Sequence, residues 1–239
     1  MQYHLIPAAF GQIIAGAFGW DSIAGGAIGV VMIQGFKRAA FSNEAGAGSA
    51  SIAHSAVKTK YSASEGLVAL LEPFIDTVVI CTMTALVIII FNFGGDASGA
   101  TIFQYGGDGA GAVLIDGVSY EGAGITSKAF AQYIPYSNVF LTVAVVLFAV
   151  STMISWSYYG LQSWKFLFGR GKAADMAYKL LFLLFVVIGA SASMKSIWAF
   201  SDAMIFAMVF PNMVGLYFLF PVVKEQLKRY TDAIKDSHA

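Results

Sequence analysis

Three ionisable side chains interrupt an apolar stretch early in the chain. In such a stretch a charged side chain is expected to be functional or to form an ion pair. Lys37 and Arg38 follow one apolar run, and Glu44 lies in a second run of apolar and small residues directly after them. An ionisable side chain inside a bilayer is costly, so it is usually functional or paired. We expect Glu44 to pair with Arg38 or Lys37 and to hold the backbone of this stretch in shape.

The composition indicates that lipid surrounds this stretch. Of the 239 residues, 58% are hydrophobic and only 12% are charged, whereas soluble domains carry roughly 25% charged residues. Fourteen basic and fourteen acidic residues cancel, so no global basic field favours nucleic acid as a partner. The single cysteine, Cys81, excludes an intramolecular disulfide framework and a cysteine-based zinc cluster. The chain is therefore expected to be an integral membrane protein.

Apolar runs predict where the helices cross the membrane, because about 20 residues span the hydrocarbon core. The runs that reach this length cover residues 67–93, 137–163, 176–194 and 198–223. As one helix, the stretch 20–57 would be about 55 Å long at ~1.5 Å per residue, so it must be broken or strongly tilted. The sequence thus predicts an all-α single transmembrane domain over 1–239 with five helices, and leaves open whether residues 1–18 span.

Basic residues fix the orientation, because Lys and Arg in short loops stay on the cytoplasmic side. They cluster before the second helix, after the third and at the end of the chain. The Gly-rich, acidic segment 94–136 contains a single basic residue, Lys128. We therefore expect 94–136 to be an external loop and the C-terminus to be cytoplasmic. Within that loop, the alternation in AVLIDGVSY favours a small hairpin.

The stretch 20–57 is predicted to be a broken helix. Small residues surround its charges, namely Gly35, Ala39, Ala45, Gly46 and Gly48, and they let a ligand or another helix approach the backbone. Broken helices are how secondary transporters present free N–H and C=O groups to a substrate and its ions. The alternative is that Lys37 and Arg38 only mark a membrane boundary.

Motifs in this region resemble a known family. GFKRAAFSNEAGAGSASIAHSAVKT, followed by GLVALLEPFIDTVVICTMTALVII, closely resembles the alanine or glycine:cation symporters, also called sodium:alanine symporters. ISWSYYG at 154–160 fits the same family. The resemblance implies a leucine-transporter-like fold of two inverted five-helix repeats, with substrate and sodium between the broken first helices. This chain would be the second repeat, the C-terminal half, and the N-terminal repeat would be missing.

The resemblance also implies which residues contact the substrate. It places the unwound part of the broken helix at 36–41, so that Phe36, Ala39 and Ala40 line the amino-acid pocket. Family members commonly have Gly where Ala39 stands, and the extra methyl would favour glycine or alanine as cargo. Thr152 and Trp156 are four residues apart and share a helix face. In the family the matching pair contacts substrate, with the indole capping the pocket.

For sodium, the resemblance implies a half-site on the same helix. The hydroxyls of Ser151 and Thr152 and the carbonyl of Phe148, one turn earlier, would be the ligands. Sodium that must be released again suits neutral hydroxyl and carbonyl oxygens better than a cage of carboxylates. The alternative is that such hydroxyls only bond to the carbonyl four residues earlier in the helix.

The expected function is sodium-coupled import of a small neutral amino acid by alternating access in the inner (plasma) membrane. Ion and cargo would organise the same broken helices, so each raises the affinity for the other. No cofactor is expected beyond the coupling ion. The alternative is a non-transporting membrane subunit or a truncated remnant. The chain lacks HExxH, GxSxG and protease-type paired membrane aspartates, so it is not expected to be an enzyme.

Overall fold

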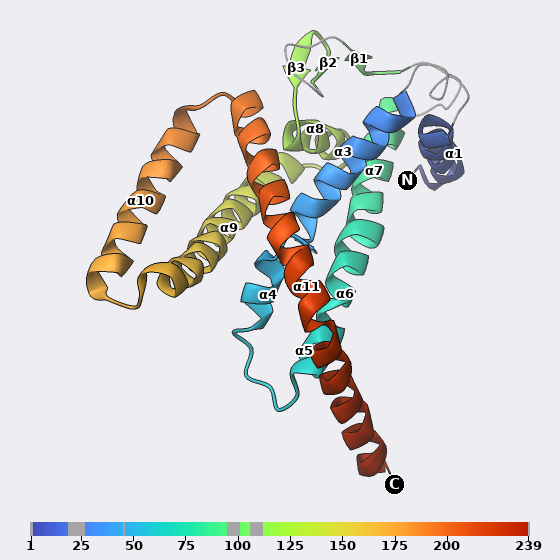
Figure 1. Cartoon of the computed structure of the whole chain (residues 1–239). Helices are drawn as coiled ribbons and strands as arrows, with labels where there is room; N and C mark the ends of the chain where they lie inside the picture. The colour runs from blue at the N-terminus through green and yellow to red at the C-terminus, as the bar shows by residue number, and fades with distance from the viewer. Residues whose placement is uncertain (1, 19–26, 45, 95–100, 106–111, 239) are drawn as a thin grey trace. The chain divides into compact units, whose positions relative to one another are not determined.

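The computed structural model describes residues 2–18, 27–44, 46–94, 101–105 and 112–238. Over these ranges the chain is mainly helical (Figure 1). It divides into two compact units. The first unit consists of Met1–Phe36 and Val79–Ser151, and the second of Lys37–Val78 and Thr152–Ala239. Each unit is described separately below.

The helices that carry the described chain vary widely in length. In order they are η1 (Tyr3–Leu5), α1 (Ile6–Phe18), α3 (Ala27–Ser42), α4 (Ser49–His54), α5 (Ser62–Ala69), α6 (Leu71–Pro73), the π-helix η2 (Phe74–Cys81), α7 (Thr82–Asn92), α8 (Ala123–Tyr133), α9 (Ser137–Phe168), α10 (Lys172–Ser191) and α11 (Met194–His238). Residues 1–18, whose role the sequence left open, thus include two of these helices.

Four helical stretches in the described residues are long and apolar enough to cross a membrane. They are Ser62–Asn92, Ser137–Phe168, Lys172–Ser191 and Met194–Asp236, and they correspond to four of the expected spans. Most extend beyond the apolar runs because helical hydrogen bonding continues into polar ends that hydropathy does not mark. The expected fifth stretch, 20–57, contains α3 and α4, while its residues 20–26 lie outside the described part.

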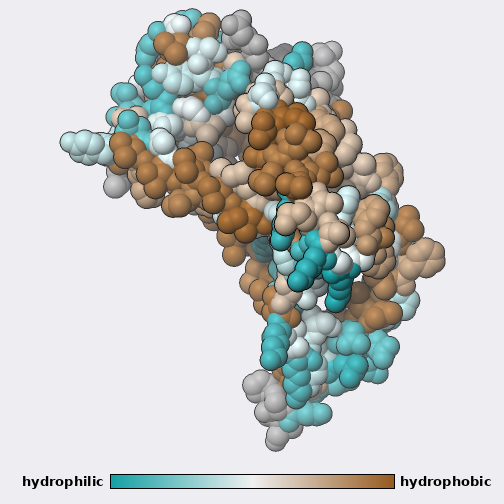
Figure 2. Space-filling model, turned by 90° about the vertical axis from the view of Figure 1, so that its left-hand side faces the viewer, coloured by the Kyte–Doolittle hydropathy of each residue, from teal (hydrophilic) through white to brown (hydrophobic). Residues whose placement is uncertain are grey.

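Large apolar side chains cover the outside of these helices. Phe140 and Phe148 of α9 and Phe218 of α11 are among the most exposed. Figure 2 shows broad hydrophobic areas over the helices, with hydrophilic side chains gathered at the end that carries the last turns of α11. Exposed apolar surface of this extent is what a lipid-facing helix presents. The fold is that of a multi-pass integral membrane protein.

In the first unit, the all-α prediction requires one correction, because part of segment 94–136 forms a sheet. Strands β1 (Gln104–Tyr105), β2 (Val113–Ile115) and β3 (Val118–Tyr120) pair antiparallel in the order β1-β2-β3. Asp116 and Gly117 both have positive φ, 53° and 78°, as the tightest hairpin turns require. The hairpin expected from AVLIDGVSY is therefore confirmed, with Ile115 opposite Val118.

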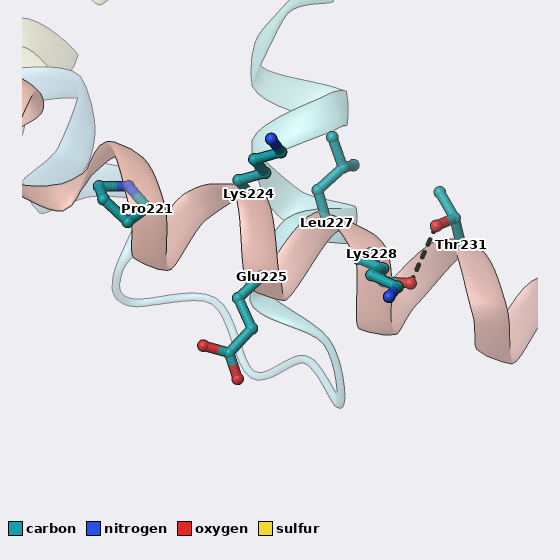
Figure 3. Close-up of a pocket in the computed structure, with 6 residues that line it drawn as sticks. All are labelled: Pro221, Lys224, Glu225, Leu227, Lys228 and Thr231. Carbon is teal, nitrogen blue, oxygen red and sulfur yellow. Dashed lines mark hydrogen bonds between the residues drawn. The ribbon is translucent and has the colours of Figure 1, made fainter.

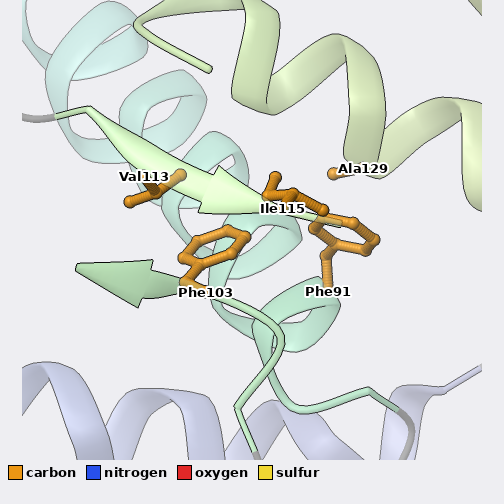
Figure 4. Packing of buried hydrophobic residues seen from close by; sticks show 5 residues of the cluster. All are labelled: Phe91, Phe103, Val113, Ile115 and Ala129. Carbon is orange, nitrogen blue, oxygen red and sulfur yellow. The ribbon is translucent and has the colours of Figure 1, made fainter. Parts of the chain in front are cut away.

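This sheet has a small apolar core of its own (Figure 4). The buried members are Phe91, Phe103, Val113, Ile115 and Ala129. They come from α7, β2, α8 and the chain leading into β1, so the sheet and α8 close over the end of α7. The Asn92 side chain accepts a hydrogen bond from the backbone N–H of Phe103 at 2.8 Å.

In the second unit, the part of α9 from Thr152 onward is followed by α10 after a turn at Gly169, where φ is +85°. Lys165 and Lys179 both contact Asp175, at 3.2 and 3.5 Å. Near this turn Tyr178 packs directly on Gly160, where an added Cβ would clash with the tyrosine hydroxyl.

The same unit places α11 beside α5, where the rings of Tyr61 and Tyr230 pack 5.7 Å apart. At the end of α4, the imidazole of His54 lies 2.8 Å from Glu65 of α5 and 3.3 Å from Glu72 of α6. The sequence alone did not predict that carboxylates lie beside His54. These contacts hold the short helix α4 against the start of the next span.

Candidate functional site

The centre of the candidate site is an interruption between α3 and α4. Helix α3 ends at Ser42 and α4 begins at Ser49. Between them the backbone turns at Glu44, Gly46 and Gly48, whose φ angles are 54°, 83° and 98°. A left-handed backbone ends a helix, and glycine adopts it without the clash of a Cβ. The described residues of the unwound segment are therefore 43–44 and 46–48.

This position corrects the sequence-based placement of the unwound part at 36–41. Phe36, Ala39 and Ala40 all lie inside α3. The reason is local, because residues 36–41 contain no glycine or proline and are compatible with a helix, whereas the glycines that permit a left-handed backbone come later. The helix thus continues past both charges before it stops.

Side chains from the π-helix hold the end of α3. Ser42 donates a hydrogen bond to the carboxylate of Asp76, and the Asn43 amide donates one to the hydroxyl of Thr77 at 2.7 Å. Asp76 and Thr77 belong to the FIDT motif, which falls within η2. π-helical turns are rare and occur often at functional sites. Asn43 is buried, so its hydrogen bond offsets a real desolvation cost.

The structure gives Arg38 a different partner from the expected one. Its guanidinium lies 2.7 Å from Asp202 of α11, and the Lys37 amine lies 3.4 Å from the same carboxylate. Within the described residues no ion pair joins Arg38 to Glu44. Glu44 lies beyond the end of α3, where the backbone has left the helix with φ of 54°, whereas Asp202 lies beside the last turns of the helix.

A pocket of about 480 Å³ adjoins the interruption. It lies within the second unit and takes its walls from four helices and the unwound segment. Its lining includes Gly48, Ser49, Trp156, Tyr178 and Asn212, and none of its lining residues is charged. Ser49 is 3% exposed, and its hydroxyl has no hydrogen-bond partner among the described residues. A neutral pocket with a free hydroxyl suits a neutral ligand that brings its own polar group.

The predicted substrate residues separate into two groups. Trp156 lines the pocket and is half-buried, with its ring 6.0 Å from that of Tyr159. Phe36, Ala39, Ala40 and Thr152 do not line it. Phe36 is 68% exposed, while the two alanines are half-buried on α3.

The predicted sodium ligands all lie on α9. Phe148, Ser151 and Thr152 are exposed, and their spacing of three and four residues places them on one helix face. Within the described chain neither hydroxyl donates to the carbonyl four residues earlier, although Thr142 of the same helix does so at 2.8 Å. The two hydroxyls thus retain their bonding capacity.

A second depression is a surface feature of one helix. Its lining residues are Pro221, Lys224, Glu225, Leu227, Lys228 and Thr231. Figure 3 shows them all on α11, with the Thr231 hydroxyl donating to the carbonyl of Lys228. A single helix face cannot enclose a ligand, so this depression is not a candidate for the cargo site.

Sequence reasoning missed two polar residues of α11, Asp202 and Asn212. Asp202 pairs with the cations of α3, and the Asn212 amide donates to the carbonyl of Gly46 at 2.9 Å. Both lie inside the apolar run 198–223, where polar side chains are usually paired or functional. That general signal identifies them as candidates, but it does not identify their partners.

Four potential membrane-spanning helices and an interrupted helix beside a neutral pocket define the class: a multi-pass membrane protein with a site at a helix break. The family model described as the sodium:alanine symporter family matches residues 1–239. The chain therefore belongs to the sodium:alanine symporter family, whose members are transporters and not enzymes.

Individual relatives agree with this assignment. A sodium/alanine symporter of Methanococcus maripaludis is 35% identical over 233 residues, which are 98% of this chain and 47% of the relative. A sodium/proton-dependent alanine carrier protein of Bacillus sp. (strain PS3) is 30% identical over 96% of this chain and 51% of the relative. A probable sodium/glutamine symporter of Bacillus subtilis is 31% identical over 95% of this chain and 43% of the relative. The chain spans about half the length of the relatives it matches.

Proposed function

We propose that this chain is the C-terminal part of a sodium-coupled symporter that imports a small neutral amino acid, alanine or glycine, by alternating access. It supplies the second inverted repeat of a leucine-transporter-like fold, and a first repeat supplies the facing wall. The protein lies in the inner (plasma) membrane with its C-terminus in the cytoplasm. The names of the relatives support this proposal, since two refer to alanine and a third to glutamine.

One observation carries the proposal: the unwound segment, through Ala47 and Gly48, adjoins a pocket without charged side chains. The backbone groups that a broken helix leaves unpaired bind the charged ends of a zwitterion. The neutral pocket accommodates a small uncharged side chain and would leave a charged one unpaired, which is costly. Trp156 forms part of this pocket's wall.

Sodium is assigned to the α9 half-site, Phe148, Ser151 and Thr152. Support comes from the three oxygens on one face of α9 and from the two hydroxyls that do not bond within the helix. Because ion and cargo are held by the same helices, binding of either stabilises the arrangement that the other requires, and the coupling is reciprocal.

The proposal is tested by uptake of radiolabelled alanine and glycine into proteoliposomes that contain the full-length transporter. We expect uptake in sodium buffer and none above background when choline replaces sodium. Uptake that is indifferent to sodium would refute the coupling. The absence of alanine and glycine uptake, together with uptake of a charged amino acid, would refute the cargo class.

A further inference from the structure

We propose that α11 sets the geometry of the helix break, with Asp202 and Asn212 as its positioning residues. This inference rests on the proposed transport function, because it assigns α11 the task of keeping the site in its binding-competent form. Its evidence lies entirely within the second unit, in contacts before the break and inside it.

Before the break, Asp202 binds the cations of α3. Its carboxylate lies 2.7 Å from Arg38 and 3.4 Å from Lys37, and its side chain is only 16% exposed. A charge-assisted hydrogen bond at this distance is among the stronger polar contacts in a protein. One carboxylate thus fixes two consecutive residues, which restrains both the position and the rotation of the last turns of α3.

Aromatic rings complete this first anchor. The Arg38 guanidinium lies 4.2 Å from the ring centroid of Trp198 and 4.9 Å from that of Phe41. The two rings meet edge to face, with centroids 5.8 Å apart. Trp198 is four residues before Asp202, so both lie on one face of α11. Cation–π contacts add to the ion pair and restrict the guanidinium to a single orientation.

Inside the break, Asn212 binds the unwound backbone directly. Its amide donates to the carbonyl of Gly46 at 2.9 Å, and a Cβ at position 48 would lie 3.2 Å from the Asn212 Cβ. Pro211 precedes it within α11, and a proline inside a helix leaves a carbonyl unpaired and permits a bend. The asparagine therefore satisfies a carbonyl that the break exposes, at a point where α11 can itself bend.

The two anchors are separated by ten residues of one helix, which is about 15 Å along its axis. A helix of this kind holds the end of α3 and the unwound backbone in one register, so a shift of α11 moves both together. If an anchor is lost, the break samples other arrangements. The apparent affinity for cargo then falls in proportion to the population of the competent one.

Amide hydrogen exchange of the full-length protein in nanodiscs tests the positioning role without transport. We expect faster exchange over 43–48 in both Asp202→Asn and Asn212→Ala, with exchange in α9 and α10 unchanged. The matched control is Asp175→Asn, since Asp175 also binds two cations, Lys165 and Lys179, away from the break. This control should leave exchange over 43–48 as in the wild type.

Transport kinetics in proteoliposomes add the functional readout. In Asp202→Asn we expect the KM for alanine to rise roughly tenfold, the low end for losing a hydrogen bond between charged groups. Asp202→Glu keeps the charge and should restore most of the affinity. A merely structural role would instead lower the amount of active protein, and so Vmax, with KM unchanged.

The outcomes separate this inference from the proposed function. Unchanged exchange over 43–48 in both variants would overturn the positioning role, whether or not the protein transports alanine. Failure of the wild type to transport alanine or glycine would count against the proposed function, while the exchange result still decides the role of α11. If Asp202→Asn unfolds globally, exchange rises in all helices, and Asn212→Ala decides alone.

Discussion

Of the substrate residues predicted from the sequence, Trp156 lines the pocket and the other four do not. Replacing it with alanine removes the aromatic wall beside the interruption and leaves the hydroxyls of α9 in place. We expect Trp156→Ala to raise the KM for alanine by roughly tenfold or more, as for other central aromatic contacts. The sodium concentration for half-maximal uptake should change much less.

Trp164→Ala provides the matched control for that variant. Trp164 lies on the same helix and packs against Phe168 and Tyr178, with ring centroids 4.3 and 5.8 Å away, but it does not line the pocket. Its loss should lower stability and leave the KM for alanine near the wild-type value. Equal losses of alanine and sodium affinity in Trp156→Ala would mean that Trp156 serves packing alone.

Thr152 provides the corresponding test for sodium. Thr152→Val keeps the shape of the side chain and removes one proposed ligand oxygen. We expect the sodium concentration for half-maximal uptake to rise about tenfold, which corresponds to about 1.4 kcal/mol. Thr142→Val is the control, because that hydroxyl already donates to the Asn138 carbonyl. If both variants require the same sodium concentration, the half-site on α9 is wrong.

Gly48 has a conformation that other residues adopt only with strain. Its φ is +98°, and an added Cβ would lie 3.2 Å from Asn212. Gly48→Ala should therefore destabilise the protein by about 1–3 kcal/mol, seen as a lower apparent Tm in detergent. In contrast, Gly66 lies inside α5 with nothing within 4 Å. Gly66→Ala should raise stability by up to ~1 kcal/mol, and a lower Tm there would contradict this reasoning.

At the scale of elements, the contact between Tyr178 of α10 and the backbone of α9 depends on Gly160. A Cβ at that position would clash with the Tyr178 hydroxyl and lie 2.9 Å from the ring. Gly160→Ala must displace the ring, at a cost of about 1–3 kcal/mol for overpacking. We expect the double variant Gly160→Ala with Tyr178→Ala to lose less stability than the sum of the single variants. Strict additivity would show that the two positions are not in contact.

The sequence predicted the elements well where the signal is local. Apolar runs of sufficient length identified four helices, and the alternation in AVLIDGVSY indicated the hairpin. The family resemblance placed the unwound part too early, at 36–41, where the residues are compatible with a helix. The glycines that let the backbone turn, Gly46 and Gly48, were noted only for allowing close approach.

Side-chain partners across the chain were beyond prediction from one sequence. Arg38 and Asp202 are separated by 164 positions. The rule that an ionisable side chain in a membrane is usually paired is satisfied by any acidic residue in a neighbouring helix. Glu44 was the natural choice because it is near in sequence, but it lies beyond the end of α3. The pocket was missed for the same reason, since its walls come from helices whose mutual packing no local pattern determines.

At the scale of the whole molecule, the proposed mechanism requires that one set of helices serve both ligands. In the proposal, α11 anchors the end of α3 and the unwound backbone at the site, and the proposed sodium ligands lie on α9, which also carries Trp156. Such an arrangement makes cargo affinity depend on sodium and sodium affinity depend on cargo by the same factor. The chain spans about half the length of its relatives, and in the proposed function a facing repeat would complete the site.

The most direct test of sodium-coupled transport is accumulation against a gradient. Proteoliposomes with the full-length transporter are loaded with alanine at the external concentration, and an inward sodium gradient is then imposed. The account predicts that labelled alanine accumulates above the external concentration and that this excess disappears when a sodium ionophore collapses the gradient. Alanine that only equilibrates, with or without the gradient, would contradict the account.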